Sequence, residues 1–345
     1  MFSKLRAVNL LGPTLAARIG KSKELSNSTI RGYYATQVLI ALIDVGFIDA
    51  LAAGDTISVG SFARSENLDA TILQSLCDYA YELGYLDRRD PGYMLSQKGV
   101  LVNELIKGAL LSVHAYADIF NNLDSLLRGE SAYGVNITRK SKYVAIGSGY
   151  SAQVLAIPVL SRLLLEHKRT RILDLACGDA TFLVNMCASS PQFSGYGVDI
   201  APEAVEAGNQ QLAARGFKDR VQLVVADMFA MDGSFGEVGA IDATTCVYAL
   251  HEFLSDDNER LMSLLRKYRT RFPGVPLVVC EVIRHSPAEL RSKPGGVMEI
   301  QLLHDLSNQR LATRGEWQEI FRQAGFANVD ETYLDFARTA VFVAG

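Results

Sequence analysis

The stretch that decides the fold is ILDLACGDATF, residues 172–182. A short apolar run leads to Asp174, and a small turn-forming segment around Gly178 follows it. This order is typical of a buried strand that passes through a tight turn into a helix. Because ligands of open α/β sheets bind at the carboxyl ends of the strands, we expect a nucleotide or nucleoside at this turn.

From residue 168 onward, short β-rich runs alternate with amphipathic helical segments. The alternation predicts an α/β fold, a parallel sheet with helices on both faces. The last two strands have no helix between them, so we expect them to form an antiparallel pair at one edge. The expected strands are 171–176, 194–199, 221–227, 240–248, 276–282, 328–334 and 338–344, and the expected helices are near 181–189, 202–215, 256–271 and 313–324.

Length and composition indicate a chain of more than one domain. It has 345 residues, 49% of them hydrophobic, and a formal net charge of −4. This size allows two cores, and the lack of a basic excess argues against nucleic acid as a partner. We expect a winged-helix dimerisation domain over 1–103, a mostly helical linker and lid over 104–167, and a ligand-binding α/β domain over 168–345.

The N-terminal domain is predicted from the order of its elements. Residues 58–102 read as two short helices followed by two strands, which is the order of a winged helix. The second helix, 70–84, has no Lys or Arg, although a DNA-reading helix needs basic side chains for phosphate contacts. We therefore expect a homodimer that buries the apolar stretch 33–51. A small helix within residues 1–25 and a long helix over 28–53 are expected before this module.

Cysteine usage and hydropathy bear on where the protein resides. The five cysteines are scattered without the paired spacing of a metal site, and several lie in apolar runs. They are typical of reduced core cysteines in a cytoplasmic protein. No apolar run reaches 18 residues, so we expect no membrane span and no membrane partner.

Acidic residues at three successive strand ends indicate which ligand the turn binds. Asp174 and Asp179 put negative charge before and within the turn, which disfavours a pyrophosphate and suits the cationic, phosphate-free nucleoside S-adenosylmethionine. Asp199 ends the second strand, where a carboxylate accepts ribose hydroxyls, and Asp227 ends the third, within reach of the adenine amino group. The predicted cofactor-binding residues are Asp174, Ala176, Gly178, Asp199, Ile200, Asp227 and Met228.

On these motifs the chain resembles class I S-adenosylmethionine-dependent methyltransferases, specifically small-molecule O-methyltransferases with an N-terminal winged-helix dimerisation domain. The resemblance covers essentially the whole chain and implies a Rossmann-like, seven-stranded methyltransferase domain. In these enzymes a histidine after the fourth strand is the general base, and His251 in CVYALHEFLSDDNERL, 246–261, matches it. The chain departs from their pattern at Phe253, where they carry tryptophan, and has Glu252 directly after the histidine.

A second histidine raises the question of a metal site. His304 lies in MEIQLLHDLSNQRLATRGEW, residues 298–317. Together with His251 and Glu252 it would form a two-histidine, one-carboxylate face for Fe, Zn or Mn. The alternative is structural: a hydrogen-bonded histidine in an apolar helix, and a glutamate that caps a helix.

The segments LHEF and LLHDLSNQRLATRGEW resemble the 2-oxo acid C-methyltransferases of nonproteinogenic amino acid biosynthesis, the phenylpyruvate and 2-ketoarginine methyltransferase group. This resemblance implies that His251, Glu252 and His304 are the catalytic residues and hold one divalent ion, with Asp305 as a neighbouring partner or alternative carboxylate. It implies methylation of the β-carbon of a 2-oxo acid through a metal-chelated enolate, in secondary metabolism such as antibiotic biosynthesis. Among such acids we favour 5-guanidino-2-oxopentanoate, 2-ketoarginine.

The implied chemistry is consistent with the acidity of the substrate. A divalent ion acting as a Lewis acid stabilises the enolate, and the protein mainly positions the β-carbon against the sulfonium methyl group. The proton acceptor stays open between a metal-bound water, Tyr143 and Tyr150 of the polar segment 127–151, which we expect to be a lid or part of the binding site. Arg139 and Lys140 in that segment are candidates to hold the substrate carboxylate.

Two other interpretations stay open. One is a metal-free small-molecule O-methyltransferase in which His251 alone is the general base. The other is a catalytically silent winged-helix regulator that senses S-adenosylmethionine, against which the helix without basic residues argues.

Overall fold

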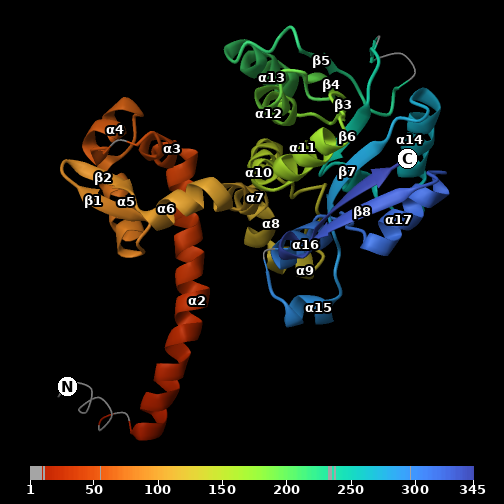
Figure 1. Ribbon diagram of the computed structural model, residues 1–345. Helices are drawn as coiled ribbons and strands as arrows, with labels where there is room; N and C mark the ends of the chain where they lie inside the picture. The colour runs from red at the N-terminus through yellow and green to blue at the C-terminus, as the bar shows by residue number, and fades with distance from the viewer. Residues whose placement is uncertain (1–9, 11, 55, 232–234, 237, 296) are drawn as a thin grey trace. The chain divides into compact units, whose positions relative to one another are not determined.

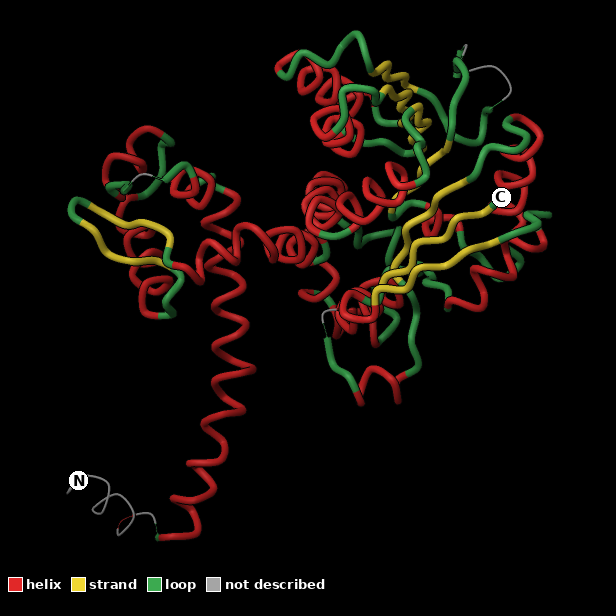
Figure 2. Tube along the Cα trace, viewed as in Figure 1, coloured by secondary structure: helices red, strands yellow, loops and turns green. Residues whose placement is uncertain are grey.

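In the computed structural model the chain divides into two compact units, Met1–His114 and Ala115–Gly345. The structure describes residues 10, 12–54, 56–231, 235–236, 238–295 and 297–345, and each unit is described by itself (Figures 1 and 2). The three-part division expected from the sequence stays a prediction.

A long helix dominates the first unit. We expected a small N-terminal helix and a separate one over 28–53, but α2 runs without a break from Pro13 to Asp44 (Figure 1). Pro13 is suited to the first turn, because its fixed φ is helical and its missing N–H would have no partner there. The helix stops before Gly46, whose φ of 77° is left-handed, and α3 (Phe47–Ala52) follows. Residues 1–9 and 11 of the expected small helix lie outside the described residues.

The remainder of the first unit follows the predicted element order. It contains α4 (Val59–Ser65) and α5 (Ala70–Glu82), and the strands β1 (Leu86–Arg89) and β2 (Gly92–Leu95) pair antiparallel. The side chain of Asp69 caps α5 by accepting from two backbone N–H groups. The interpretation of this module as a winged helix that dimerises stays a prediction.

Helices connect this module to the sheet of the second unit. The predicted lid 127–151 is irregular only in its first part, because residues 141 onward form a helix in spite of Gly147 and Gly149 within it. No single helix among the described residues is long and apolar enough to cross a membrane, although the pair α10–α11, bent by 51°, passes by length and composition. The elements are α6 (Gln97–Leu101), η1 (Val102–Ile106), α7 (Lys107–Ala115), α8 (Ala117–Asn121), α9 (Leu123–Leu127), α10 (Ser141–Val154) and α11 (Ala156–Glu166).

The second unit is built on a seven-stranded sheet of order β5-β4-β3-β6-β7-β9-β8. The first five of these strands are parallel, whereas β9 pairs antiparallel with both β7 and β8, so the predicted fold class and antiparallel edge are confirmed. The strands are β3 (Arg171–Leu175), β4 (Ser194–Asp199), β5 (Val221–Val225), β6 (Ala243–Val247), β7 (Leu277–Val282), β8 (Val329–Leu334) and β9 (Thr339–Ala344).

Helices cover both faces of this sheet (Figure 1). Ile172 and Val278 belong to a buried cluster with side chains of α11 and α12, while Leu173 and Val279 join α14 and α17 on the other face. Successive strand residues thus alternate between two apolar layers, as expected for a fully covered parallel sheet. The helices and short turns are α12 (Thr181–Ser189), α13 (Pro202–Ala214), η2 (Leu250–Phe253), α14 (Glu259–Arg271), α15 (Pro287–Ser292), α16 (Val297–Leu306), α17 (Arg314–Gln323) and η3 (Asp335–Ala337).

Candidate functional site

The turn between β3 and α12 has the backbone of a tight ligand-binding turn. Ala176, Gly178 and Ala180 all have left-handed φ angles, of 56°, 55° and 60°. Only glycine adopts this region freely, so the two alanines are strained there. The turn is held by hydrogen bonds from Cys177 N to Val198 O (3.0 Å) and from Gly178 N to a carboxylate oxygen of Asp199 (2.8 Å).

The predicted carboxylates gather at this turn. Asp174 is buried and accepts a hydrogen bond of 2.6 Å from the Thr245 hydroxyl. Burial raises the pKa of Asp174 to about 7 against this hydrogen bond, and the charge of Asp199 adds to the rise. A cationic ligand at the turn would favour the ionised form of Asp174. The structure therefore brings Asp174, Gly178 and Asp199 together, as the sequence suggested.

Asp199 and Asp227 also organise the loops after their strands. Asp199 accepts from Ala201 N at 2.9 Å with its second oxygen, and Asp227 accepts from Phe229 N at 2.9 Å. Ala226 N donates to the Asp199 carbonyl at 2.9 Å, which sets the two strand ends side by side. An ionised carboxylate offers about four acceptor positions, so both keep capacity for hydroxyl or amino groups. Of their neighbours, Ile200 is 69% exposed, whereas Met228 is buried.

Asp179 has a different role from the one its charge suggested. Its carboxylate accepts from Thr181 N (3.2 Å), Thr181 Oγ1 (2.7 Å) and Gln211 Nε2 (2.9 Å). These bonds hold Thr181, the first residue of α12, and tie the turn to α13.

The two predicted histidines lie next to each other. The rings of His251, in η2, and His304, in α16, meet edge to face with centroids 5.1 Å apart. Nδ1 of His251 is 2.6 Å from Oε2 of Glu281, and Nδ1 of His304 is 2.7 Å from the Ile300 carbonyl. Because an ionised carboxylate and a carbonyl can only accept, Nδ1 is the donor in both rings, and Nε2 is left with the lone pair in the neutral form.

The two histidines differ in their electrostatic environment. Burial would lower the pKa of His251, but the charge and hydrogen bond of Glu281 outweigh it and the pKa is raised. Burial and the neighbouring His251 lower the pKa of His304 to about 4, so this ring is neutral at pH 7. The pair thus combines one imidazole that is readily protonated with one that is not.

Glu281 is a site residue that the sequence analysis missed. It lies in β7, is fully buried, and accepts from the backbone N–H groups of Leu250 (2.8 Å) and His251 (3.3 Å) as well as from the His251 ring. A buried carboxylate needs such partners. The available signal was a single charge within the apolar strand LVVCEV.

Glu252 is surrounded by a ring of polar side chains. Arg139 donates to both of its carboxylate oxygens at 3.0 Å, and Gln309 donates to Oε2 at 2.5 Å. Arg139 also donates to the Tyr116 hydroxyl at 3.1 Å, and that hydroxyl donates to Gln309 Oε1 at 3.3 Å. Burial would raise the pKa of Glu252, but Arg139 outweighs it and the pKa is lowered. Oε1 of Glu252 lies 3.7 Å from Nε2 of His251, so this group of polar side chains lies next to the histidine pair.

As they stand, no three His, Cys, Asp or Glu side chains in the described part of the chain have the geometry of a metal site. The other residues considered from the sequence lie at several places in the second unit. Asp305 is paired with Arg284 at 2.7 Å, the backbone of Lys140 donates to the Ala115 carbonyl, and Tyr143 packs beside a small apolar cluster that contains Leu303. Tyr150 lies further along α10.

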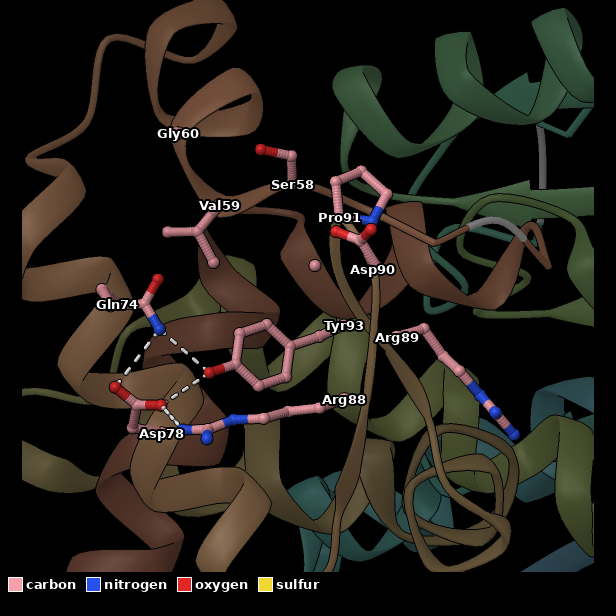
Figure 3. Close-up of a pocket in the computed structure, with 11 residues that line it drawn as sticks. Ser58, Val59, Gly60, Gln74, Asp78, Arg88, Arg89, Asp90, Pro91 and Tyr93 are labelled. Atoms are coloured by element: carbon pink, nitrogen blue, oxygen red, sulfur yellow. Dashed lines mark hydrogen bonds and ion pairs between the residues drawn. The ribbon is translucent and has the colours of Figure 1, made fainter.

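A pocket of about 490 Å³ in the first unit contains none of the predicted site residues (Figure 3). Four of its polar side chains bond to one another, since Asp78 accepts from Gln74, Arg88 and the Tyr93 hydroxyl. We therefore place the candidate site at the strand ends of the second unit.

Comparisons with known proteins find methyltransferases among the relatives of this chain. Residues 172–269 match the family described as Methyltransferase domain. The chain is 28% identical to a 2-ketoarginine methyltransferase from Streptomyces arginensis over 89% of each chain. It shares the fold of an O-methyltransferase family protein from Burkholderia thailandensis (17% identity, TM-score 0.63, 93% and 96% of the two chains). It also shares the fold of human N-acetylserotonin methyltransferase solved with S-adenosylmethionine (18%, 0.66, 94% and 97%).

The contact between Glu281 and His251 leads to a first prediction. Glu281→Gln removes the charge that raises the pKa of His251 and leaves burial to lower it. The pKa of His251, followed by NMR titration of the ring, should fall. Since the folded pKa of His251 lies above its ordinary value of 6.5, the pair stabilises the fold below that pH, and the contribution is lost as the pH rises through the folded pKa.

Glu289→Gln is the matched control, because Glu289 lies 3.9 Å from His285 and has no bond to His251. It should leave the His251 titration unchanged. Identical His251 titrations in Glu281→Gln and wild type would show that Glu281 does not set this pKa.

Proposed function

Because the chain is a class I S-adenosylmethionine-dependent methyltransferase, we propose that it methylates the β-carbon of a 2-oxo acid, with 2-ketoarginine as the substrate. The substrate is inferred from the 2-ketoarginine methyltransferase that aligns with 89% of this chain. The reaction is inferred from the histidine pair and the carboxylate beside it.

The observation that carries the proposal is the hydrogen bonding of the two histidines. Each donates Nδ1–H, His251 to the Glu281 carboxylate and His304 to the Ile300 carbonyl. Metal-binding histidines have this arrangement, because an acceptor at one nitrogen fixes the tautomer that offers the other to the ion. Two histidines that served only to fill the core would not need to share the same tautomer.

By its chemistry, the donor set of His251, Glu252 and His304 suits a divalent ion once Glu252 is released from Arg139. Two imidazoles and a carboxylate suit Zn, Fe or Mn, and the low pKa of His304 keeps its ring unprotonated. The ion would supply Lewis-acid polarisation of the 2-oxo group. Arg139, already bidentate to a carboxylate, has the geometry to bind the carboxylate of a 2-oxo acid.

The strand-end carboxylates would hold the cofactor. S-adenosylmethionine supplies the electrophilic methyl group and leaves as S-adenosylhomocysteine. Asp199 would accept the ribose hydroxyls from its place beside Gly178, and Asp227 would face the adenine amino group. In the hydrogen-bond network around Glu252, Tyr116 stays protonated, because burial raises its pKa. It can therefore donate a hydrogen bond there.

Asp199→Ala tests the cofactor site. The affinity for S-adenosylmethionine, measured by calorimetry, should fall about 10-fold or more, since hydrogen bonds to a charged group contribute about 1.5–3 kcal/mol. Asp330→Ala, at an exposed position of β8, is the control and should bind as wild type does. Unchanged affinity in Asp199→Ala would remove Asp199 from the site.

Removal of single histidines tests the metal. His251→Ala and His304→Ala should each abolish both the bound metal, measured by elemental analysis, and turnover, and a chelator should abolish turnover of the wild type. His167→Ala, an exposed histidine after α11, should keep both.

The metal-free O-methyltransferase alternative predicts a different pattern. His251, with its raised pKa, would then be the general base. His251→Ala would inactivate the enzyme, His304→Ala would have a mild effect, and chelators would have none. Full activity of a rigorously metal-free preparation would decide for this alternative.

We also infer a homodimer, on a surface different from the one the sequence suggested. Many apolar side chains of the stretch 33–51 are buried within the first unit, whereas α2 exposes large apolar side chains as far as Tyr34. An apolar stripe on a helix is stabilised by a partner surface. The exposed residues are Leu15, Ile19, Leu25, Ile30, Tyr33 and Tyr34.

Charged substitutions on α2 test the dimer. Leu25→Glu combined with Ile30→Glu should yield a folded monomer in sedimentation at micromolar concentration, because each places a charge in the apolar contact. Leu127→Glu, at an 88% exposed position of α9, should leave the dimer intact. A wild-type monomer at this concentration would refute the inference.

A further inference from the structure

Arg139 holds the carboxylate that the proposed metal site needs. Both oxygens of Glu252 accept from Arg139 at 3.0 Å, and Gln309 adds a third bond to Oε2. In this state both carboxylate oxygens of Glu252 are bound to the guanidinium of Arg139. The positive charge of Arg139 also lies close to the position between His251 and His304, where it opposes a divalent ion.

The same guanidinium is the one suited to bind the carboxylate of a 2-oxo acid. Exchange of one carboxylate for another at Arg139 costs little free energy, because an equivalent bidentate pair of charge-assisted hydrogen bonds replaces the first pair. Its third contact, to the Tyr116 hydroxyl, can persist during the exchange and keep the side chain in place. The Tyr116–Gln309 bond likewise does not involve Arg139.

We propose that Arg139 is exchanged between Glu252 and the substrate carboxylate, so that substrate binding releases Glu252 to the divalent ion and the two ligands bind cooperatively. This inference rests on the proposed function. It makes Arg139 a positioning residue for the metal site as well as a substrate ligand. Without substrate, Arg139 keeps Glu252 from the ion and the site has a lowered metal affinity.

The exchange has a signature that a purely structural role for Arg139 lacks. Loss of Arg139 should strengthen metal binding in the absence of substrate, because Glu252 is then free. The gain should depend on the Glu252 carboxylate. Thermodynamic linkage further requires the metal to tighten 2-oxo acid binding by the same factor by which the acid tightens metal binding.

A double-mutant cycle tests this dependence. The dissociation constant of Mn²⁺ is measured by calorimetry, without substrate, for wild type, Arg139→Gln, Glu252→Gln and the double variant. Arg139→Gln should bind Mn²⁺ about tenfold more tightly than wild type, within the usual range of coupling between sites. In the Glu252→Gln background the same substitution should produce a clearly smaller gain, because only the repulsion between Arg139 and the ion is then removed.

Arg171→Gln is the matched control. It removes an equal charge from a surface ion pair with Asp242, at the start of β3 and thus at the opposite end of that strand from Asp174. It should leave the Mn²⁺ affinity unchanged. Arg139→Lys keeps the charge but loses the bidentate geometry, so its Mn²⁺ affinity should lie between those of wild type and Arg139→Gln. It replaces Arg139→Gln in the cycle if that variant does not fold.

The outcomes separate this inference from the function on which it rests. If Mn²⁺ binds but Arg139→Gln (or Arg139→Lys in its place) has no tighter affinity, or gains equally in the Glu252→Gln background, the exchange is wrong and the metal site stands. If neither the wild type nor any variant binds Mn²⁺, even with saturating pyruvate, the metal site itself is wrong and the exchange falls with it.

Discussion

The hydrogen bond between His251 Nδ1 and the buried carboxylate of Glu281 determines the geometry of the candidate site. Glu281 reaches His251 from the neighbouring strand β7 and also accepts from the backbone of η2, so ring and backbone are fixed together. With Nδ1 engaged, Nε2 is the nitrogen that lies near Glu252, and the His251 ring packs against the ring of His304. A buried carboxylate with three donors on one short turn is a rigid support, and the chemistry proposed here depends on it.

Around this support, the described arrangement has charges that balance each other. Arg139 neutralises Glu252, Glu281 interacts with His251, and His304 stays neutral because of its lowered pKa. Such a site is stable without a ligand because no buried charge lacks a partner. The same balance means that a cation and an anionic substrate enter most favourably together, since each compensates the charge that the other displaces.

Much of the fold could be predicted from the sequence because its signals are local. The alternation of apolar runs and amphipathic helices placed all seven strands of the sheet within a few residues, and the acidic strand ends indicated the turn around Gly178. Helix continuity was harder: α2 extends well before residue 28, and α10 forms through a glycine-containing segment that was expected to be a loop. In both cases the polar and glycine residues that suggest a break do not prevent a helix.

The supporting contacts of the site could not be predicted, because they join residues far apart in sequence. Glu281 meets His251 across 30 residues, and Tyr116 meets Gln309 across 193. A single glutamate in a strand, or a tyrosine between two helices, carries no signal of its partner. Arg139 was considered as a carboxylate ligand, and its carboxylate in this structure is Glu252.

The position of the transferred methyl group tests the central claim most directly. The enzyme is incubated with 2-ketoarginine and S-adenosylmethionine labelled with ¹³C in its methyl group, and the product is examined by NMR. The account predicts a labelled methyl group bonded to the β-carbon and coupled to a single β-proton. A labelled methyl group on an oxygen atom, with none on the β-carbon, would contradict it.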